Sequence, residues 1–343
     1  MKTIHVVAAA ALLATCATAV EAGEQLEGWR WLKLTNEIET QGVFWNDRYG
    51  DGKDRWKTGG ITQSYVFPER IFTETGWLAD RAMALEVNLR AQVMTPDDTS
   101  NTGIDPDDRP YAQYAAAGLY VRSIARPRPL EAPFAPGLGL QVEDRVGVEI
   151  GWQGDPLPFF ELRDALHGMT GTGGSMGNGA DVIGGEILAN LEGRRSWRLH
   201  LPGAARDIEL VPFVQGSLGM REVSARAGAD LFIGSALAGR SWGSDLATGA
   251  VMAGDAPRRD GFHWTVFLGA DVGYVAWDAF LDGGFAADGR SVDREEIVGR
   301  ARAGVFLEHG RVGVGFSLNW LSKEFETQPE GQLIGAFQLK YRL

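Results

Sequence analysis

The sequence has few of the residues that cross-link a protein or carry it through a membrane as helices. Among its 343 residues there is one cysteine, Cys16, so neither a disulfide scaffold nor a cysteine-rich metal site is available. No run of 18 consecutive apolar residues occurs, which excludes a transmembrane helix. Lysine and arginine number 33 against 45 acidic residues, and the net charge of −12 argues against a nucleic-acid partner.

The first 22 residues have the composition of a secretory signal. Lys2 supplies the positive charge, and residues 6–13 form an apolar core that is too short to span a bilayer. Cleavage after Ala22 would remove Cys16. We therefore expect a signal peptide over 1–22 and one exported domain without thiols over 23–343. A lipoprotein signal at Cys16 is the less favoured alternative.

The last 33 residues alternate between apolar and small or polar side chains up to the C-terminus. The apolar positions of this stretch are Val312, Val314, Phe316, Leu318, Trp320, Leu333, Phe337, Leu339, Tyr341 and Leu343. A strand that ends at the last residue, apolar on one face and small or polar on the other, is typical of an outer-membrane β-barrel. In such a barrel the outside meets lipid and the inside meets water.

About twelve segments have the length and alternation that barrel strands need. The clearest run from Leu85 to Val93, from Val146 to Trp152 and from Trp264 to Tyr274. Weaker candidates begin near Trp29, Thr58, Pro110, Glu186, Ile208, Ala225 and Asp293. The sequence thus predicts an all-β, antiparallel outer-membrane barrel with both ends in the periplasm. A soluble β-sandwich is less favoured, because the predicted interior carries charges and glycine rather than β-branched bulk.

One segment breaks the strand pattern and predicts a short helix in an extracellular loop. Asp155 suits an N-cap, Pro156 suits the first helical position, and Gly168 suits the stop. His167 lies near the end of this segment. Neutral histidine is a competent general base, so His167 is a candidate catalytic residue.

Several motifs in order along the mature chain resemble those of one family, the calcium-dependent outer-membrane lipid A 3′-O-deacylases. They are Leu34-Thr35-Asn36-Glu37, Asp54-Arg55-Trp56-Lys57-Thr58-Gly59-Gly60, Met94-Thr95-Pro96, Asp107-Asp108-Arg109-Pro110-Tyr111-Ala112, His167, Phe280-Leu281-Asp282-Gly283 and Glu324-Phe325. The resemblance implies a twelve-stranded barrel in the outer membrane of a Gram-negative bacterium. It also implies an esterase that removes an acyloxyacyl chain from the lipid A part of lipopolysaccharide, among outer-membrane lipids. Nothing in the pattern predicts an oligomeric state.

The resemblance also implies roles for particular residues. His167 would activate water, and Asn36, Glu37 and Thr58 would form the catalytic and Ca²⁺ environment, since calcium prefers oxygen ligands. Thr58 has the opposite strand parity to Ile61 and Tyr65, so a bulge or a rim position is needed to bring it to the site. The site is therefore expected at the outer rim of the barrel, open to membrane lipid.

Departures from the family pattern leave other functions open. Glu37 stands where the family has aspartate, and the acidic residue that follows the histidine has only Asp181 and Glu186 as candidates. These departures favour, as the alternative, a non-catalytic structural or passive-pore barrel. A third hypothesis is a phospholipase that uses Ser175, in a G-x-S-x-G pattern, as its nucleophile. The glycine-rich surroundings of Ser175 lack the strand and helix that such a nucleophile needs.

Overall fold

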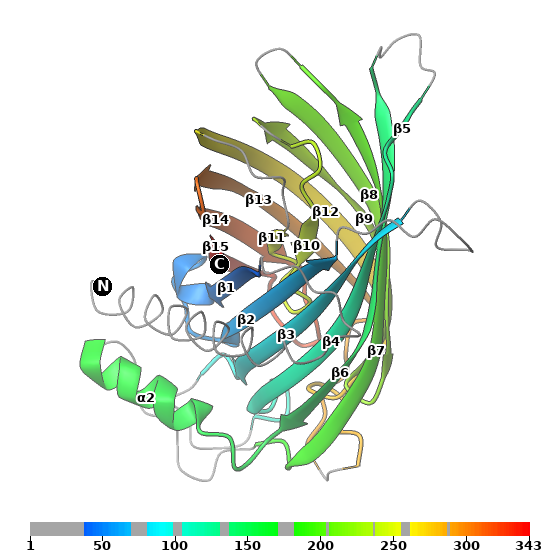
Figure 1. The fold of residues 1–343 in the computed structure, drawn as a ribbon. Coiled ribbons are helices and arrows are strands. Elements are labelled where there is room, and N and C mark those ends of the chain that lie inside the picture. The colour runs from blue at the N-terminus through cyan, green and yellow to red at the C-terminus, as the bar shows by residue number, and fades with distance from the viewer. Residues whose placement is uncertain are drawn as a thin grey trace, which may run out of the picture.

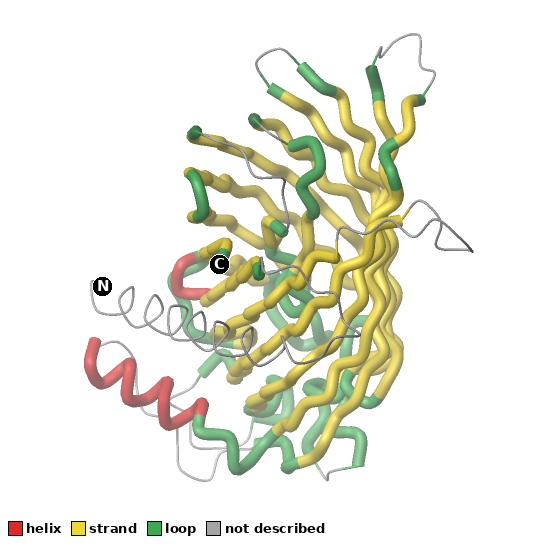
Figure 2. The backbone as a smooth tube through the Cα atoms, in the orientation of Figure 1, coloured by secondary structure: helices red, strands yellow, loops and turns green. Residues whose placement is uncertain are grey.

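The computed structural model describes residues 38–69, 81–98, 105–130, 137–170, 182–203, 206–235, 237–254, 261–286 and 289–343. Twelve long strands form the wall of a barrel (Figures 1 and 2), as the sequence predicts. They are β1 (Glu39–Asn46), β2 (Trp56–Glu69), β3 (Arg81–Thr95), β4 (Ala112–Ala125), β6 (Gly139–Gln153), β7 (Glu186–Leu201), β8 (Asp207–Gly219), β9 (Glu222–Gly234), β12 (Phe262–Asp278), β13 (Ile297–His309), β14 (Val312–Leu321) and β15 (Gln332–Arg342).

Shorter elements complete the fold. They are η1 (Asp47–Tyr49), β5 (Arg128–Pro129), α2 (Phe159–Thr170), β10 (Trp242–Ser244) and β11 (Val251–Ala253). Among the described residues, no helix is both long and apolar enough to span a membrane.

The barrel closes through its first and last strands. All neighbouring long strands are antiparallel, and β1 pairs with both β2 and β15, so Glu39 lies opposite Arg342. We name the end at which Glu39 and Arg342 pair the periplasmic end, and the end that carries η1 and α2 the outer end. The predicted strand near Trp29, like the predicted signal peptide, falls outside the described residues.

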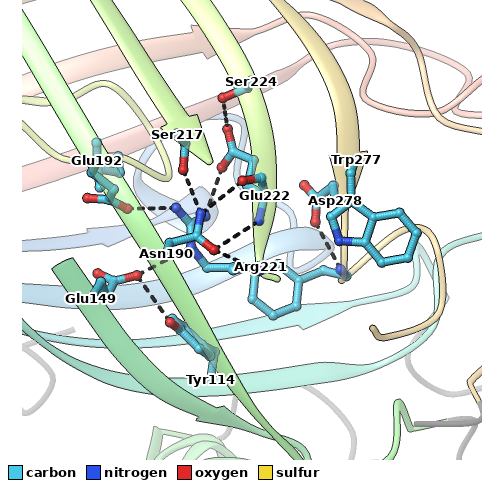
Figure 3. Close-up of polar contacts among 12 residues, drawn as sticks. Tyr114, Glu149, Asn190, Glu192, Ser217, Arg221, Glu222, Ser224, Trp277 and Asp278 are labelled. Atoms are coloured by element: carbon cyan, nitrogen blue, oxygen red, sulfur yellow. Dashed lines mark hydrogen bonds and ion pairs between the residues drawn. The ribbon is translucent and has the colours of Figure 1, made fainter. Parts of the chain in front are cut away.

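The alternation of side chains separates an apolar outer wall from a charged interior. Exposed apolar side chains follow every second position of the strands, among them Leu119, Val146, Val148, Ile150, Leu191, Leu268, Val272, Val314 and Leu318. The positions between them carry buried arginine, glutamate and aspartate, which confirms the predicted charged interior. Figure 3 shows one such cluster, in which Arg221 lies among Glu149, Glu192 and Glu222 at 3.3, 2.8 and 2.8 Å.

A segment between β9 and β12 folds back into the barrel and fills part of its interior (Figure 1). We name residues 237–254 the plug; it starts from the periplasmic end and contains β10 and β11. Trp242 of the plug stacks on Phe232 with ring centroids 4.2 Å apart. Side chains of the wall strands also bond to it, among them Thr62 to Asp245 at 2.7 Å, Arg194 to Ser244 at 2.8 Å, Arg300 to the Leu246 carbonyl at 3.0 Å and Lys340 to the Gly254 carbonyl at 2.8 Å.

Candidate functional site

The candidate site lies at the outer end, where β1 ends and β2 begins. The pairing of β2 with β3 shifts register between Lys57 and Gly59, so Thr58 occupies a bulge, as its parity requires. Trp56, just before it, has φ 52°, a left-handed conformation that is uncommon for a bulky residue. Bulges and strained backbone near functional sites commonly serve to aim a side chain.

Thr58 is held in place by neighbours on both sides. Its hydroxyl lies 2.7 Å from that of Thr95 in β3, and its carbonyl accepts a hydrogen bond of 2.7 Å from the Asn46 side-chain amide. The side-chain oxygen of Asn46, Oδ1, in turn accepts a hydrogen bond from the Arg48 backbone N–H at 2.9 Å. The threonine and the asparagine are therefore fixed relative to each other across two strands.

Asp47 follows Asn46 and is fully buried. Its Oδ2 accepts hydrogen bonds from the Arg55 backbone N–H at 2.6 Å and from the Gln332 amide at 3.5 Å. Its Oδ1 is buried and has no hydrogen-bond donor. Burial holds the pKa of the Asp47 carboxyl well above its usual range, although the Arg55 N–H lowers it in part. A buried carboxylate oxygen without a donor is a candidate ligand for a cation.

Loops from distant parts of the chain close over this site. The Arg55 guanidinium lies 3.9 Å from the Trp56 ring centre and bonds to Asp97 at 3.1 Å and to Glu330 at 2.6 Å. Glu324 bonds to Lys57 and lies 3.5 Å from Arg109. Burial acts to raise the pKa of Glu324, but Lys57 and Arg109 bring it below its ordinary value. Charge pairs therefore join the loops of the outer rim, beside an apolar cluster of Trp56, Leu281, Val292 and Phe325.

Helix α2 stands at the same end of the barrel (Figure 1) but begins later than the sequence predicts. It starts at Phe159 rather than beside Pro156, because the side chain of Gln113 in β4 accepts a hydrogen bond of 3.1 Å from the Phe159 N–H. It also continues past Gly168 to Thr170. His167 lies within its span, and the His167 side chain is outside what the structure describes.

The structure describes only some of the predicted site residues. Thr58 is at the site; Asn36, Glu37, Ser175 and Asp181 fall outside the described residues. The structure instead places Asn46, the last residue of β1, against Thr58, followed by Asp47 at the start of η1; the sequence reasoning missed both. The sequence did contain a signal for these two residues. Asn46 is followed by aspartate, the acid that the resembled family prefers, and the pair lies just before a glycine-containing turn.

Glu186, the other candidate acid, has a structural role in this arrangement. Its carboxylate accepts hydrogen bonds from the Gln153 side chain at 2.7 Å and from the N–H groups of Phe285 and Ala286 at 2.6 and 2.7 Å. It therefore ties the start of β7 to the loop after β12.

Within the described ranges, no three histidine, cysteine, aspartate or glutamate side chains gather to hold a metal ion.

Comparison with known proteins gives a matching family and several structures of related fold. The profile of a family described as Outer membrane protein LpxR matches residues 6–343. The structure of LpxR from Salmonella typhimurium superposes with a TM-score of 0.70 and 18% sequence identity, over 88% of this chain and 99% of that one. The translocator domain of the autotransporter NalP from Neisseria meningitidis is similar at a TM-score of only 0.40 and 12% identity, over 96% and 98% of the two chains. A search of curated sequences finds no match.

Proposed function

Because this chain belongs to the LpxR family of outer membrane proteins, we propose that it is a lipid A deacylase, an esterase that removes an acyloxyacyl chain from lipopolysaccharide. The observation that carries the proposal is the buried Asp47 carboxylate, with its donor-free Oδ1, beside Thr58 and Asn46 at the outer rim. Lipopolysaccharide occupies the outer leaflet, so its ester bonds lie near this rim. An ester hydrolase also needs a positive group to stabilise the developing oxyanion.

Calcium is the group that the family implies, and the residues here suit it by type. Ca²⁺ takes six to eight oxygen ligands from carboxylates, amides, backbone carbonyls and water. Asp47 Oδ1 is free for such a bond, and the oxygens of Asn46 and Thr58 lie next to it in the chain or across the strand pair. Bound there, calcium would supply Lewis-acid polarisation of the ester carbonyl.

The chain's own residues would carry the proton transfers. His167, on α2, would take a proton from water, and the resulting hydroxide oxygen would bond to the ester carbonyl carbon. As the carbon–oxygen bond to the sugar breaks, the same proton would pass from His167 to the departing sugar oxygen. Thr58 and Asn46 would orient the site, since the hydrogen bond between them and the bond from Thr58 to Thr95 leave them little freedom.

Mass spectrometry of lipid A tests this function directly. We expect a host that expresses the protein to lose an acyloxyacyl mass when calcium is present and to keep it when calcium is chelated. The His167→Ala variant should lose activity by roughly 100-fold or more, because general-base catalysis contributes that much. Unchanged lipid A, with the wild-type barrel folded in the outer membrane, would refute the proposed activity. Full activity of His167→Ala would instead refute the role of the histidine.

The alternative of a passive pore makes a different prediction. A twelve-stranded barrel is wider than the eight-stranded barrels that side chains alone fill, so an empty interior would conduct ions. Here the plug bonds to at least four wall strands, which favours a closed interior. We expect no stable conductance in planar bilayers for wild type and for the control Trp242→Phe. A stable conductance is expected when residues 241–254 are replaced by a short glycine–serine linker. Conductance of the wild type would favour the pore.

A further inference from the structure

A row of polar and charged side chains crosses the lipid-facing wall on four neighbouring strands. It consists of Arg81 in β3, Ser123 in β4, Asp144 in β6 and Arg195 in β7, and we name it the charged row. Ser123 pairs with Asp144 across the strands, and Asp144 pairs with Arg195. Arg195 binds Asp144 through two hydrogen bonds, of 2.6 and 3.2 Å, and Arg81 bonds to both Ser123 and Asp144.

The charged row faces outward, among apolar neighbours. Arg195 shares its strand face with Ile187 and Leu191 on one side and with Trp197 on the other, and Asp144 shares its face with Val146. The Arg195 side chain is 54% exposed. Charged groups on a lipid-facing surface are costly, and they are retained mainly where they have a function. The row has two guanidinium groups for one carboxylate, so it presents an excess positive charge to the lipid.

A hollow of about 870 Å³ begins at this row and continues along the outer wall. Asp144 and Arg195 line one end, and Tyr274 and Ile297, near the outer ends of β12 and β13, line the other. Between them the wall has small residues: Gly193, Gly216, Ala225 and Ala227. A Cβ added at Gly216 would meet only the Ser224 carbonyl at 3.6 Å, and one at Gly193 would meet Val146 at 3.8 Å and the Arg145 carbonyl at 4.0 Å, which are ordinary contact distances. The space above these glycines is therefore open.

We propose that the charged row and this hollow bind an anionic phospholipid of the periplasmic leaflet. The phosphate would bond to Arg195 and Arg81, and an acyl chain would lie in the hollow. Arginine binds phosphate through paired hydrogen bonds, and the excess charge of the row complements an anion.

The charged row lies far from the candidate catalytic site. Arg81 is the first residue of β3 and Thr95, which bonds to Thr58, is the last. A 15-residue strand spans about 48 Å. Lipopolysaccharide phosphates lie at the outer end with Thr95, whereas Arg81 lies at the periplasmic end. This placement favours a phospholipid over the substrate as the occupant.

Native mass spectrometry of protein extracted from vesicles tests the proposal. Wild-type protein from vesicles of phosphatidylethanolamine with added phosphatidylglycerol should retain one phosphatidylglycerol, and protein from phosphatidylethanolamine alone should retain none. Arg195→Gln should lower this retention about fivefold, as expected for the loss of one arginine contact. The matched control Arg311→Gln, at the exposed turn between β13 and β14, should retain lipid as the wild type does. Equal retention by the two variants, or equal retention of both lipids, would overturn the proposal.

A second variant tests the hollow without changing any charge. Gly216→Leu would fill the space above the glycine, so we expect it to lose phosphatidylglycerol while it remains folded by heat-modifiability on gels. Unchanged retention in Gly216→Leu would overturn the assignment of the hollow. With lipopolysaccharide added to the vesicles, retention of lipid A instead of phospholipid would overturn the choice of ligand. Deacylation by Arg195→Gln should equal that of wild type, so this test is independent of the proposed catalytic function.

Discussion

Replacing Asp47 with asparagine is expected to lower calcium-dependent deacylation of lipid A by about 100-fold or more. The variant keeps the shape of the side chain but removes the negative charge that would hold the cation near the ester, and losses of this size follow removal of one oxyanion-stabilising group. The measurement is the initial rate of release of the acyloxyacyl chain at saturating calcium. Asp54→Asn is the matched control, because it removes the same charge from the same turn and should remain close to wild type.

Because the pKa of Asp47 is raised, a loss of activity in Asp47→Asn can be distinguished from a loss of folding. A carboxyl whose pKa is raised on folding stabilises the folded state at low pH, and this contribution is lost as the pH rises through the folded value. Asp47→Asn should therefore be at least as stable as wild type at neutral pH. Protons also compete with calcium for Asp47, so the half-saturating calcium concentration of wild type should rise as the pH falls through this raised pKa. Wild-type activity in Asp47→Asn would contradict the assignment of the cation site.

Replacing Arg302 with methionine is expected to destabilise the barrel by about 3–5 kcal/mol. Arg302 is almost fully buried and bonds to Asp230 at 2.6 Å and to Asp271 at 2.6 Å. Its loss leaves Asp230 paired with Arg194, at 3.5 Å, whereas Asp271 keeps Arg300 and Arg226. The cost comes mainly from a buried carboxylate that has lost its closest cation.

Urea unfolding in lipid vesicles, followed by tryptophan fluorescence, measures this loss. Arg311→Met serves as the control and should change the free energy of unfolding by less than about 0.5 kcal/mol, since exposed substitutions usually do. Adding Asp230→Asn to Arg302→Met should recover part of the lost stability, because the second change removes the stranded charge. Equal stability of Arg302→Met and Arg311→Met would show that the interior charges do not hold the barrel together.

The wall of the barrel could be predicted from the sequence because its pattern is local. The side chains of each strand point alternately to lipid and to the interior, with a period of two. The strands β12 and β14 can therefore be predicted from the alternation of residues such as Leu268 and Leu318 with their neighbours. The plug could not be predicted in this way. Its strands, β10 and β11, have three residues each, and what buries them is contact with distant wall residues such as Thr62 and Lys340.

The site was predicted in part for a related reason. Parity required either a bulge or a rim position at Thr58, and the structure has a bulge there. Which residue of β1 lies against Thr58 depends on where β1 ends, and the period of the side-chain pattern does not define that position. Asn46 and Asp47 reach Thr58 because β1 continues to Asn46, and the pairing of Asn46 with Gly59 sets the register. Likewise, the start of α2 depends on Gln113, which lies 46 residues earlier in the chain.

The pairing of β1 with β15 has a consequence for the order of assembly. The ring closes with residues from the two ends of the described chain, and such distant contacts are the slowest to form. Lys340 of β15 bonds to the carbonyl of Gly254 in the plug. The last strand therefore reaches its final contacts only when residues 237–254 are already inside. We therefore expect the plug to be in place before β1 and β15 complete the ring, so that a closed ring without the plug is not an intermediate of assembly.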